Sequence, residues 1–168
     1  MFGRRALIAA FVLFAAGGAQ AQQRDCRPMV IAPVTASDVS CALRRWYVAV
    51  NAKPGVPGDV GRLYAQHDSL LLSTLKPAPF QGRANITTYF VGLLDHPELS
   101  VTSDQSRTIP DKFDLFPTGG AVSGFYTFRW RDTGKPPTVA PSRFTFVYRL
   151  DTNTHQLAIV THHSSKLP

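Results

Sequence analysis

The spacing of hydrophobic positions divides the chain into a helical first half and a β-rich second half. Residues 38–50 carry apolar side chains at three- and four-residue spacing, which predicts a helix capped by Ser37 or Asp38. The prolines and glycines of residues 51–58 end this helix. The pattern then predicts a second helix over residues 59–67.

The period later changes from helical to that of β-strands. A short strand is predicted over residues 70–75 and a third helix over 83–95, after which apolar residues gather in β-rich runs. Turn-forming residues separate these runs at 118–120, 132–137 and 151–153. Three N-terminal helices followed by a meander of strands predict an α+β fold, with the helices packed on a bent, mainly antiparallel sheet.

The first 21 residues have the pattern of a secretory signal peptide. Arg4 and Arg5 precede an apolar run, residues 6–16, and small residues lead up to Ala21. This run is shorter than the about 20 apolar residues that a membrane-spanning helix needs, so we expect export, cleavage after Ala21 and no membrane association afterwards. The arginine pair also resembles a twin-arginine signal, although the short charged region favours the ordinary secretory route. The mature chain is predicted to be periplasmic or secreted.

The charge of the chain argues against one class of partner. The formal net charge is +7 at pH 7, and two of the basic residues belong to the predicted signal peptide. The remaining Arg and Lys residues are scattered, with no basic run interleaved with aromatic residues, so nucleic acid is not an expected partner. The length suits one domain with a core of its own.

Cys26 and Cys41 are the only cysteines of the chain. Because an exported protein meets an oxidising compartment, we expect them to form a disulfide; the alternative is a buried free thiol at Cys41. Closing a loop of about 15 residues stabilises the folded state by about 3 kcal/mol and would tie an irregular arm, residues 22–37, to the first helix.

Two thiols are too few for a zinc site, and adjacent His162 and His163 point to opposite faces of a strand. We expect no metal and no cofactor.

Four segments carry a family resemblance. They are Leu-Tyr-Ala-Gln-His-Asp at 63–68, Tyr-Phe-Val-Gly-Leu-Leu at 89–94, Arg-Phe-Thr-Phe-Val-Tyr at 143–148 and Ile-Val-Thr-His-His-Ser-Ser at 159–165. Together they resemble the bacterial relatives of the calcium/calmodulin-dependent protein kinase II association domain, within the nuclear transport factor 2-like (SnoaL-like) superfamily. The resemblance spans roughly residues 39–168. It implies a cone-shaped, cystatin-like domain over residues 38–168, pairing of subunits through the outer face of the sheet, and a pocket between helices and sheet for a small, often anionic ligand.

The resemblance also implies which residues lie in that pocket. The kinase association domains place several arginines there, and their only clear counterpart in this chain is Arg143. Ser164 stands where their last strand has an arginine, and Tyr64 corresponds to a tyrosine of their second helix. These differences argue against a strongly anionic ligand, and nothing in this chain carries a kinase domain.

Strand alternation assigns side chains to the pocket independently, because residues two apart share a face. Arg143 lies on the less bulky face of the strand predicted over residues 142–150. His162 and Ser164 lie on the small, partly polar face of the last strand, so we place all three at the pocket. Arg143 has the paired donors to bind a carboxylate; the alternative is a structural ion pair with a helix acid such as Asp68.

Two residues are candidates for proton transfer. His162 suits a general acid or base because the ordinary pKa of histidine, about 6.5, is close to neutrality; the alternative is a strand histidine held by hydrogen bonds. Asp68 suits a base if burial raises its pKa; the alternative is a helix-end residue that takes no part.

Three functions fit these observations. The leading hypothesis is a ligand-binding domain without enzymatic activity, assembled at least as a homodimer, that holds an unidentified small molecule with Tyr64, Arg143, His162 and Ser164. The rival is a cofactor-independent isomerase, cyclase or dehydratase that uses Asp68 or His162. The third is an assembly module whose aromatic strand faces form the interface. The fold alone does not decide among them.

Overall fold

A computed structural model describes residues 26–27, 29–104 and 111–168 of the protein. The predicted signal peptide, residues 1–21, lies outside the described residues. The helices are α1 Ala36–Asn51, α2 Pro57–Gly61 and α3 Gly82–Leu94. The strands are β1 Leu70–Leu72, β2 Phe80–Gln81, β3 Ser100–Ser103, β4 Lys112–Phe116, β5 Gly119–Trp130, β6 Thr138–Asp151 and β7 Gln156–Lys166. Within this described part, no helix is both long and apolar enough to cross a membrane.

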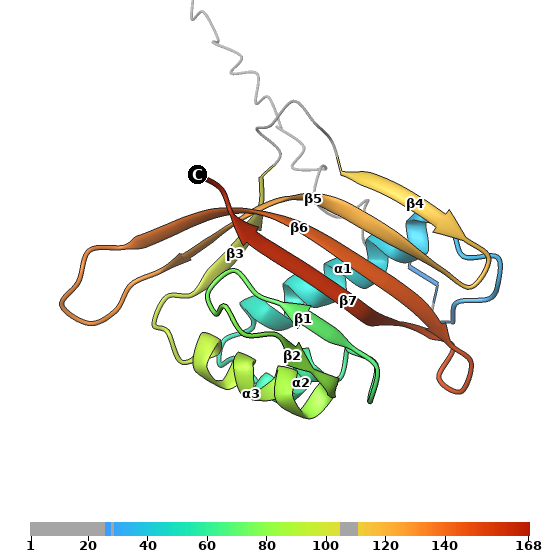
Figure 1. Ribbon diagram of the computed structural model, residues 1–168, viewed down its shortest axis with the longest axis horizontal. Helices are drawn as coiled ribbons and strands as arrows, with labels where there is room; N and C mark the ends of the chain where they lie inside the picture. The colour runs from blue at the N-terminus through green and yellow to red at the C-terminus, as the bar shows by residue number, and fades with distance from the viewer. Residues whose placement is uncertain (1–25, 28, 105–110) are drawn as a thin grey trace, which may run out of the picture.

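The strands form one mixed sheet in the order β2-β1-β7-β6-β5-β3, and β4 pairs with the first half of β5. All pairings are antiparallel except that of β1 with β7, which is parallel. In Figure 1 the long strands β5, β6 and β7 arch over α1, while α2 and α3 lie together near β1 and β2. This mainly antiparallel α+β arrangement agrees with the prediction from the sequence pattern.

α1 begins at Ala36, earlier than its pattern predicted, because Thr35 is the N-cap. Thr35 and Asp38 form a capping box, in which the Asp38 carboxylate accepts a hydrogen bond from the Thr35 backbone N–H at 2.8 Å. Asp38 also forms an ion pair with Arg27, and this hydrogen-bonded contact lowers the pKa of Asp38 to about 2. The prediction of a cap at Ser37 or Asp38 was wrong, because Asp38 acts from within the first turn.

The N-terminal arm packs against the domain. Cys26 and Cys41 form the expected disulfide, with 5.7 Å between their Cα atoms. Val30 and Val34 are buried, and their backbone N–H groups donate to carbonyls of the β6–β7 turn and the β4–β5 turn at 2.9 and 3.1 Å. A covalent bond, backbone hydrogen bonds and apolar burial therefore hold the arm against the domain.

α2 covers only the first part of the helix predicted over residues 59–67. The chain then runs beside β7, where the Ala65 N–H donates to the Ile159 carbonyl at 2.9 Å and the Ile159 N–H donates to the Leu63 carbonyl at 2.8 Å. Tyr64 forms a parallel bridge with Ile159. The prediction was wrong beyond residue 61 because these backbone groups find their partners in a strand that is distant in the sequence.

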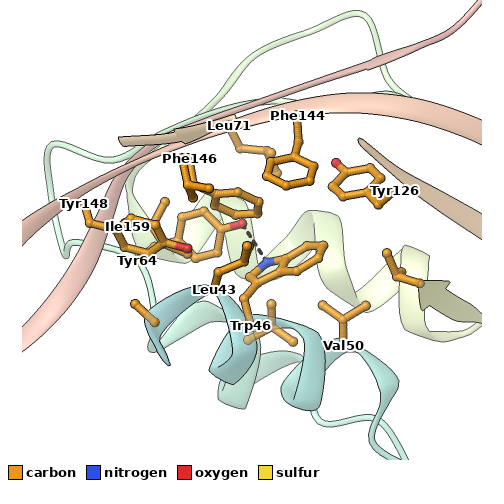
Figure 2. Close-up of a cluster of buried hydrophobic side chains, with 14 of the residues drawn as sticks. Leu43, Trp46, Val50, Tyr64, Leu71, Tyr126, Phe144, Phe146, Tyr148 and Ile159 are labelled. Carbon is orange, nitrogen blue, oxygen red and sulfur yellow. Dashed lines mark hydrogen bonds between the residues drawn. The ribbon is translucent and has the colours of Figure 1, made fainter. Parts of the chain in front are cut away.

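An aromatic core fills the space between α1 and the inner face of the sheet. Figure 2 shows Trp46 of α1 facing Tyr126, Phe144 and Phe146 of the strands, with Tyr64 beside it. Trp46, Tyr64 and Phe146 are fully buried, and the rings of Trp46 and Phe146 meet edge to face with 5.1 Å between their centroids. Because these rings are closely packed, little free volume remains between helix and sheet.

Candidate functional site

A β-bulge in β7 decides which residues of this strand face the core. Val147 of β6 pairs with Thr161, but the next residue of β6, Tyr148, pairs with Ile159. Val160 is therefore the extra residue of the bulge. Because of this extra residue, each side chain beyond it lies on the opposite face of the sheet from the one that strict alternation predicts.

The bulge turns His162 and Ser164 toward the helices. Phe146 lies opposite His162 and Phe144 lies opposite Ser164, so all four side chains share the inner face of the sheet. Strict alternation had predicted that His162 and Ile159 lie on opposite faces, yet both are buried in the core. His162 and Ser164 do face the space between helices and sheet. They do so because of the bulge, which strict alternation does not predict.

His162 is the centre of a hydrogen-bonded cluster inside the aromatic core. Its Nδ1 lies 2.8 Å from the hydroxyl of Tyr64, and its Nε2 lies 3.3 Å from the hydroxyl of Tyr126. The indole N–H of Trp46 donates to the Tyr64 hydroxyl at 3.2 Å, the bond drawn in Figure 2. The imidazole stacks on Phe146 with 3.9 Å between ring centroids. Side chains from α1, β5, β6, β7 and the segment after α2 therefore meet at this point.

Burial takes His162 out of the range in which histidine usually titrates. Its side chain is shielded from water, and this desolvation lowers its pKa to about 3, with a smaller contribution from neighbouring His163. The ring is therefore neutral at physiological pH. The expectation of acid–base chemistry near neutrality was wrong for this buried position, where His162 serves as a neutral hydrogen-bonding group.

Ser164 and Thr74 end the cluster on the side of α3. Their hydroxyl groups are hydrogen-bonded to each other. Burial raises the pKa of Tyr126, while side-chain hydrogen bonds with Ser164 and Thr74 oppose this rise. We call Trp46, Tyr64, Thr74, Tyr126, His162 and Ser164 the His162 cluster.

Two cavities adjoin the His162 cluster. The inner one is about 10 Å³, which is room for about one water molecule. It is lined by Trp46, Leu71, Ser73, Thr74, Tyr89, Phe90, Leu93, Tyr126, Phe128, His162 and Ser164. The outer one is about 230 Å³ and is lined by Leu75, Lys76, Phe80, Thr88, Tyr89, Gly92, Leu93 and His96. Tyr89 and Leu93 of α3 line both cavities, so these two side chains separate them.

Arg143 does not join the His162 cluster. Its side chain lies on the outer face of the sheet, where its Nε–H donates to the Ser165 hydroxyl at 2.8 Å. There it lines a groove of about 440 Å³ with Lys112, Phe125 and His163, among others. The prediction that Arg143 shares a face with His162 was wrong, because the bulge in β7 moved His162 to the opposite face. The inner cavity is thus left without a guanidinium group.

Asp68 lies at the rim of the sheet and away from both cavities. Its side chain is 55% exposed, and its carboxylate accepts a hydrogen bond from Arg149 at 2.5 Å. This contact lowers the pKa of Asp68. Asp68 was a candidate base on the condition that burial raises its pKa, and this condition is not met. The cation that pairs with Asp68 is Arg149, not Arg143.

Two members of the His162 cluster were missed by sequence reasoning. Tyr126 alternates with the buried residues Val122 and Phe128 on β5, so its period did indicate an inward side chain. Thr74 follows β1 in an irregular segment, and no local pattern indicated that it would meet β7.

A third group that sequence reasoning did not single out is a carboxyl at the start of β4. The carboxyl of Asp111 packs closely against Gly124 of β5, and a β-carbon added to Gly124 would collide with it. Burial raises the pKa of Asp111. Within the described ranges, no three or more His, Cys, Asp or Glu side chains gather as they would around a metal ion.

The fold is that of several solved bacterial proteins. The chain is 25% identical to a protein from Xanthomonas campestris proposed to be a calcium/calmodulin-dependent protein kinase II association domain, with a TM-score of 0.68 over 84% of this chain and 96% of that one. A nuclear transport factor 2-like protein from Salmonella enterica serovar Typhimurium is 14% identical, with a TM-score of 0.64 over 77% and 89%. A proposed dehydratase of the same family from Streptomyces avermitilis is 12% identical, with a TM-score of 0.63 over 77% and 94%.

Neither family models nor curated protein sequences match this chain, so its relationship to known proteins rests on structure. The similar structures cover most of this chain and nearly all of their own length, with helices and sheet in the same arrangement. At these identities the likeness concerns the fold, and the chemistry of each site has to be argued from its residues. The chain therefore has the nuclear transport factor 2-like fold.

Proposed function

We propose that this chain binds a small, uncharged, mainly apolar molecule between α3 and the inner face of the sheet. The observation that carries the proposal is the His162 cluster, a set of buried hydroxyl and imidazole groups beside an otherwise apolar cavity. Apolar walls with a few convergent polar groups are typical of small-molecule sites. Tyr64, His162 and Ser164 remain the proposed ligand-binding residues, and Arg143 leaves the set because it lies on the other face.

The lining of the inner cavity favours an uncharged ligand. Its walls contain no Arg, Lys, Asp or Glu, and its one histidine is neutral because burial lowers its pKa to about 3. A charge placed there without a partner would lose its hydration and gain no ion pair. A neutral molecule avoids this cost.

The ligand reaches the cluster past Tyr89 and Leu93. The outer cavity, about 230 Å³, is smaller than the roughly 300 to 1,000 Å³ of sites for drug-sized ligands, so it suits a compact molecule. Burial raises the pKa of Tyr89 to about 12, a contact with the Ser73 hydroxyl opposes this rise, and both residues line the inner cavity. A rotation of the Tyr89 side chain would join the two cavities into one site that ends at Thr74 and Ser164.

Gly92 offers a direct test of this site. It lines the outer cavity, and a β-carbon added to it meets nothing within 4 Å. Gly92→Phe therefore fills the cavity without displacing the core, and Val91→Phe, an exposed position on the same helix, is the matched control. In native mass spectrometry of the chain isolated from its host, we expect a bound molecule in the wild type and in Val91→Phe but not in Gly92→Phe. A molecule that Gly92→Phe retains would contradict the proposed site.

We also propose that the chain forms at least a homodimer through the outer face of the sheet. Phe116 and Val139 are 42% and 41% exposed and lie on this face with Phe125 and Arg143. Exposed apolar groups around a groove are typical of contact surfaces. Light scattering of wild type and Phe125→Asp at several concentrations tests this, and a wild type that is monomeric throughout would contradict it.

Export remains part of the proposal. The disulfide between Cys26 and Cys41 supports it, because such bonds persist in oxidising compartments. We expect the mature chain in the periplasm, beginning at Gln22. Amino-terminal sequencing of fractionated cells tests both points, and an intact Met1 in the cytoplasmic fraction would contradict them.

The second candidate is a cofactor-independent isomerase, cyclase or dehydratase. What favours it is the structural likeness to a proposed dehydratase of the superfamily. In this chain the reaction would use His162 as a neutral hydrogen-bonding group, since its pKa of about 3 makes it a weak base. Any turnover should fall in His162→Gln and persist in Asp68→Asn, and the reverse result would favour Asp68.

A further inference from the structure

A polar cavity lies at the rim of the sheet, where the β6–β7 turn and the segment after α2 meet the start of α3. Its volume is about 290 Å³, near the lower end of the roughly 300 to 1,000 Å³ of small-molecule sites. Its lining includes two arginines and two aspartates, namely Asp68, Arg83, Arg149 and Asp151. No described residue lines both this rim cavity and the cavities beside the His162 cluster, so it is a separate site.

Two of these four charged groups pair with each other, and the other two do not. The Asp68 carboxylate accepts a hydrogen bond from Arg149 at 2.5 Å. Among the residues that the structure describes, neither Arg83 nor Asp151 belongs to an ion pair. The pKa of Asp151 is lowered, chiefly by a backbone hydrogen bond from Thr154, and the positive charge of Arg83 adds to this effect. The rim cavity therefore presents a cation and an anion that influence each other without touching.

Hydrogen bonds with the backbone hold both of these groups in place. The Nε–H of Arg83 donates to the Tyr64 carbonyl at 2.9 Å, which leaves the N–H groups of its two terminal nitrogens for another acceptor. One carboxylate oxygen of Asp151 accepts from the backbone N–H groups of Asn153 and Thr154 at 2.8 and 3.1 Å. Groups that are fixed in advance lose less conformational entropy when a ligand binds.

We propose that the rim cavity binds a compact free α-amino acid, whose carboxylate contacts Arg83 and whose ammonium group contacts Asp151. A guanidinium group matches a carboxylate with two parallel N–H donors, and an ammonium group donates to a carboxylate. A zwitterion carries both charges in one small molecule, so it bridges two protein groups that do not reach each other. The inference goes beyond the proposed function, because both the site and the ligand differ from those beside α3.

The charges of the lining favour a zwitterion over a simple ion. A carboxylic acid without an amine would pair with Arg83 but bring its negative charge close to the Asp151 carboxylate, which is unfavourable. An amine without a carboxylate would pair with Asp151 and be repelled by Arg83. Complementary charges at both ends of the ligand avoid both costs.

Three probes of similar size test the recognition by isothermal titration calorimetry of the purified chain at low salt. They are L-alanine, L-lactate, which has a hydroxyl in place of the ammonium group, and L-alaninol, which has a hydroxymethyl group in place of the carboxylate. We expect alanine to bind about fivefold more tightly than either analogue, the upper end of what one exposed ion pair contributes. Lactate or alaninol binding as tightly as alanine would overturn the inference of a zwitterion site.

Variants that remove one charge assign the two contacts. In Arg83→Gln, alanine should bind no more tightly than alaninol binds to the wild type. In Asp151→Asn, which keeps an oxygen for the turn, alanine should bind no more tightly than lactate binds to the wild type. Arg129→Gln and Asp114→Asn are the controls, because they remove the same charges from exposed residues outside the lining, and both should keep the wild-type affinity for alanine.

The remaining outcomes also decide the matter. Alanine that binds equally well to Arg83→Gln and the wild type would overturn the proposal, as would the absence of alanine binding to the wild type. If Asp151→Asn fails to fold, Asp151→Ser removes the same charge and keeps a side-chain oxygen that can accept the hydrogen bonds of the turn. Unweakened alanine binding in that variant would contradict the contact with Asp151.

Discussion

His162 and His163 are neighbours in β7, yet they lie in opposite environments. His162 is 2% exposed, contacts two tyrosine hydroxyls and stacks on Phe146. His163 is exposed and lines the outer groove with Arg143 and Lys112. The inner face of the sheet is therefore aromatic, uncharged and closed, whereas the outer face is open and carries cations. The residue type alone therefore does not define the chemistry, because burial holds the ring of His162 neutral.

Substitutions on the inner and outer faces should differ most in their effect on the free energy of unfolding. Phe146 is fully buried on the inner face, and Phe116 is 42% exposed on the outer face. Phe146→Ala should lower the free energy of unfolding by about 3 to 5 kcal/mol, because it removes a buried ring and leaves a cavity. Phe116→Ala should cost less than about 1 kcal/mol. Denaturant titrations of both variants check this, and similar losses would mean that the outer face is also covered in solution.

The next largest effect should appear in the pH dependence of stability. The unfolded chain protonates His162 near pH 6.5, but burial lowers the pKa of the folded chain to about 3. Between these values the unfolded state binds more protons, so stability falls as the pH is lowered below about 6.5, by up to about 1.4 kcal/mol per pH unit.

The matched variants for this effect are His162→Gln and His163→Gln. Unfolding curves between pH 7.5 and 4.5 (about two pH units below the ordinary pKa of histidine) should lose this slope in His162→Gln and keep it in His163→Gln. Parallel curves for the wild type and His162→Gln would show that the ring is not held neutral.

The smallest effect should come from the rim of the sheet. Asp68 pairs with Arg149, and both side chains are 55% exposed, so water screens their attraction. Asp68→Asn should change the free energy of unfolding by about 0 to 1 kcal/mol at neutral pH. Because the contact lowers the pKa of Asp68, its contribution is present above the ordinary pKa of aspartate and disappears as the pH falls below it. A larger loss in thermal unfolding would indicate that this ion pair belongs to a more buried network.

Local patterns predicted a large part of the fold. The apolar stripe of α1, the period of α3 and the long β-hairpins all follow from side-chain spacing, because each element buries one of its faces. The helix predicted over residues 59–67 failed beyond residue 61, since the backbone of Leu63 and Ala65 bonds to Ile159 almost a hundred residues away, a contact that no local window contains.

The candidate site was predicted in part. His162, Ser164 and Tyr64 do come together at the core, whereas Arg143 and Asp68 lie on the outer face and at the rim. A single extra residue, Val160, separates Arg143 from His162 and Ser164, because it reverses the faces of β7 between Ile159 and His162. A bulge depends on how two strands pair, and strict alternation along one strand cannot predict it.

The class of the fold, the pairing of the two cysteines and the apolar positions of the main elements could be predicted without the structure. These follow from periodicity and from the small number of alternatives, with only Cys26 and Cys41 available for a disulfide. The neutral state of His162, the opposite orientation of Arg143 and the contact between Thr74 and Ser164 depend on how the chain folds in three dimensions. The physical reason is that desolvation and hydrogen-bond partners depend on neighbours from distant parts of the chain, which meet only when the sheet closes over α1.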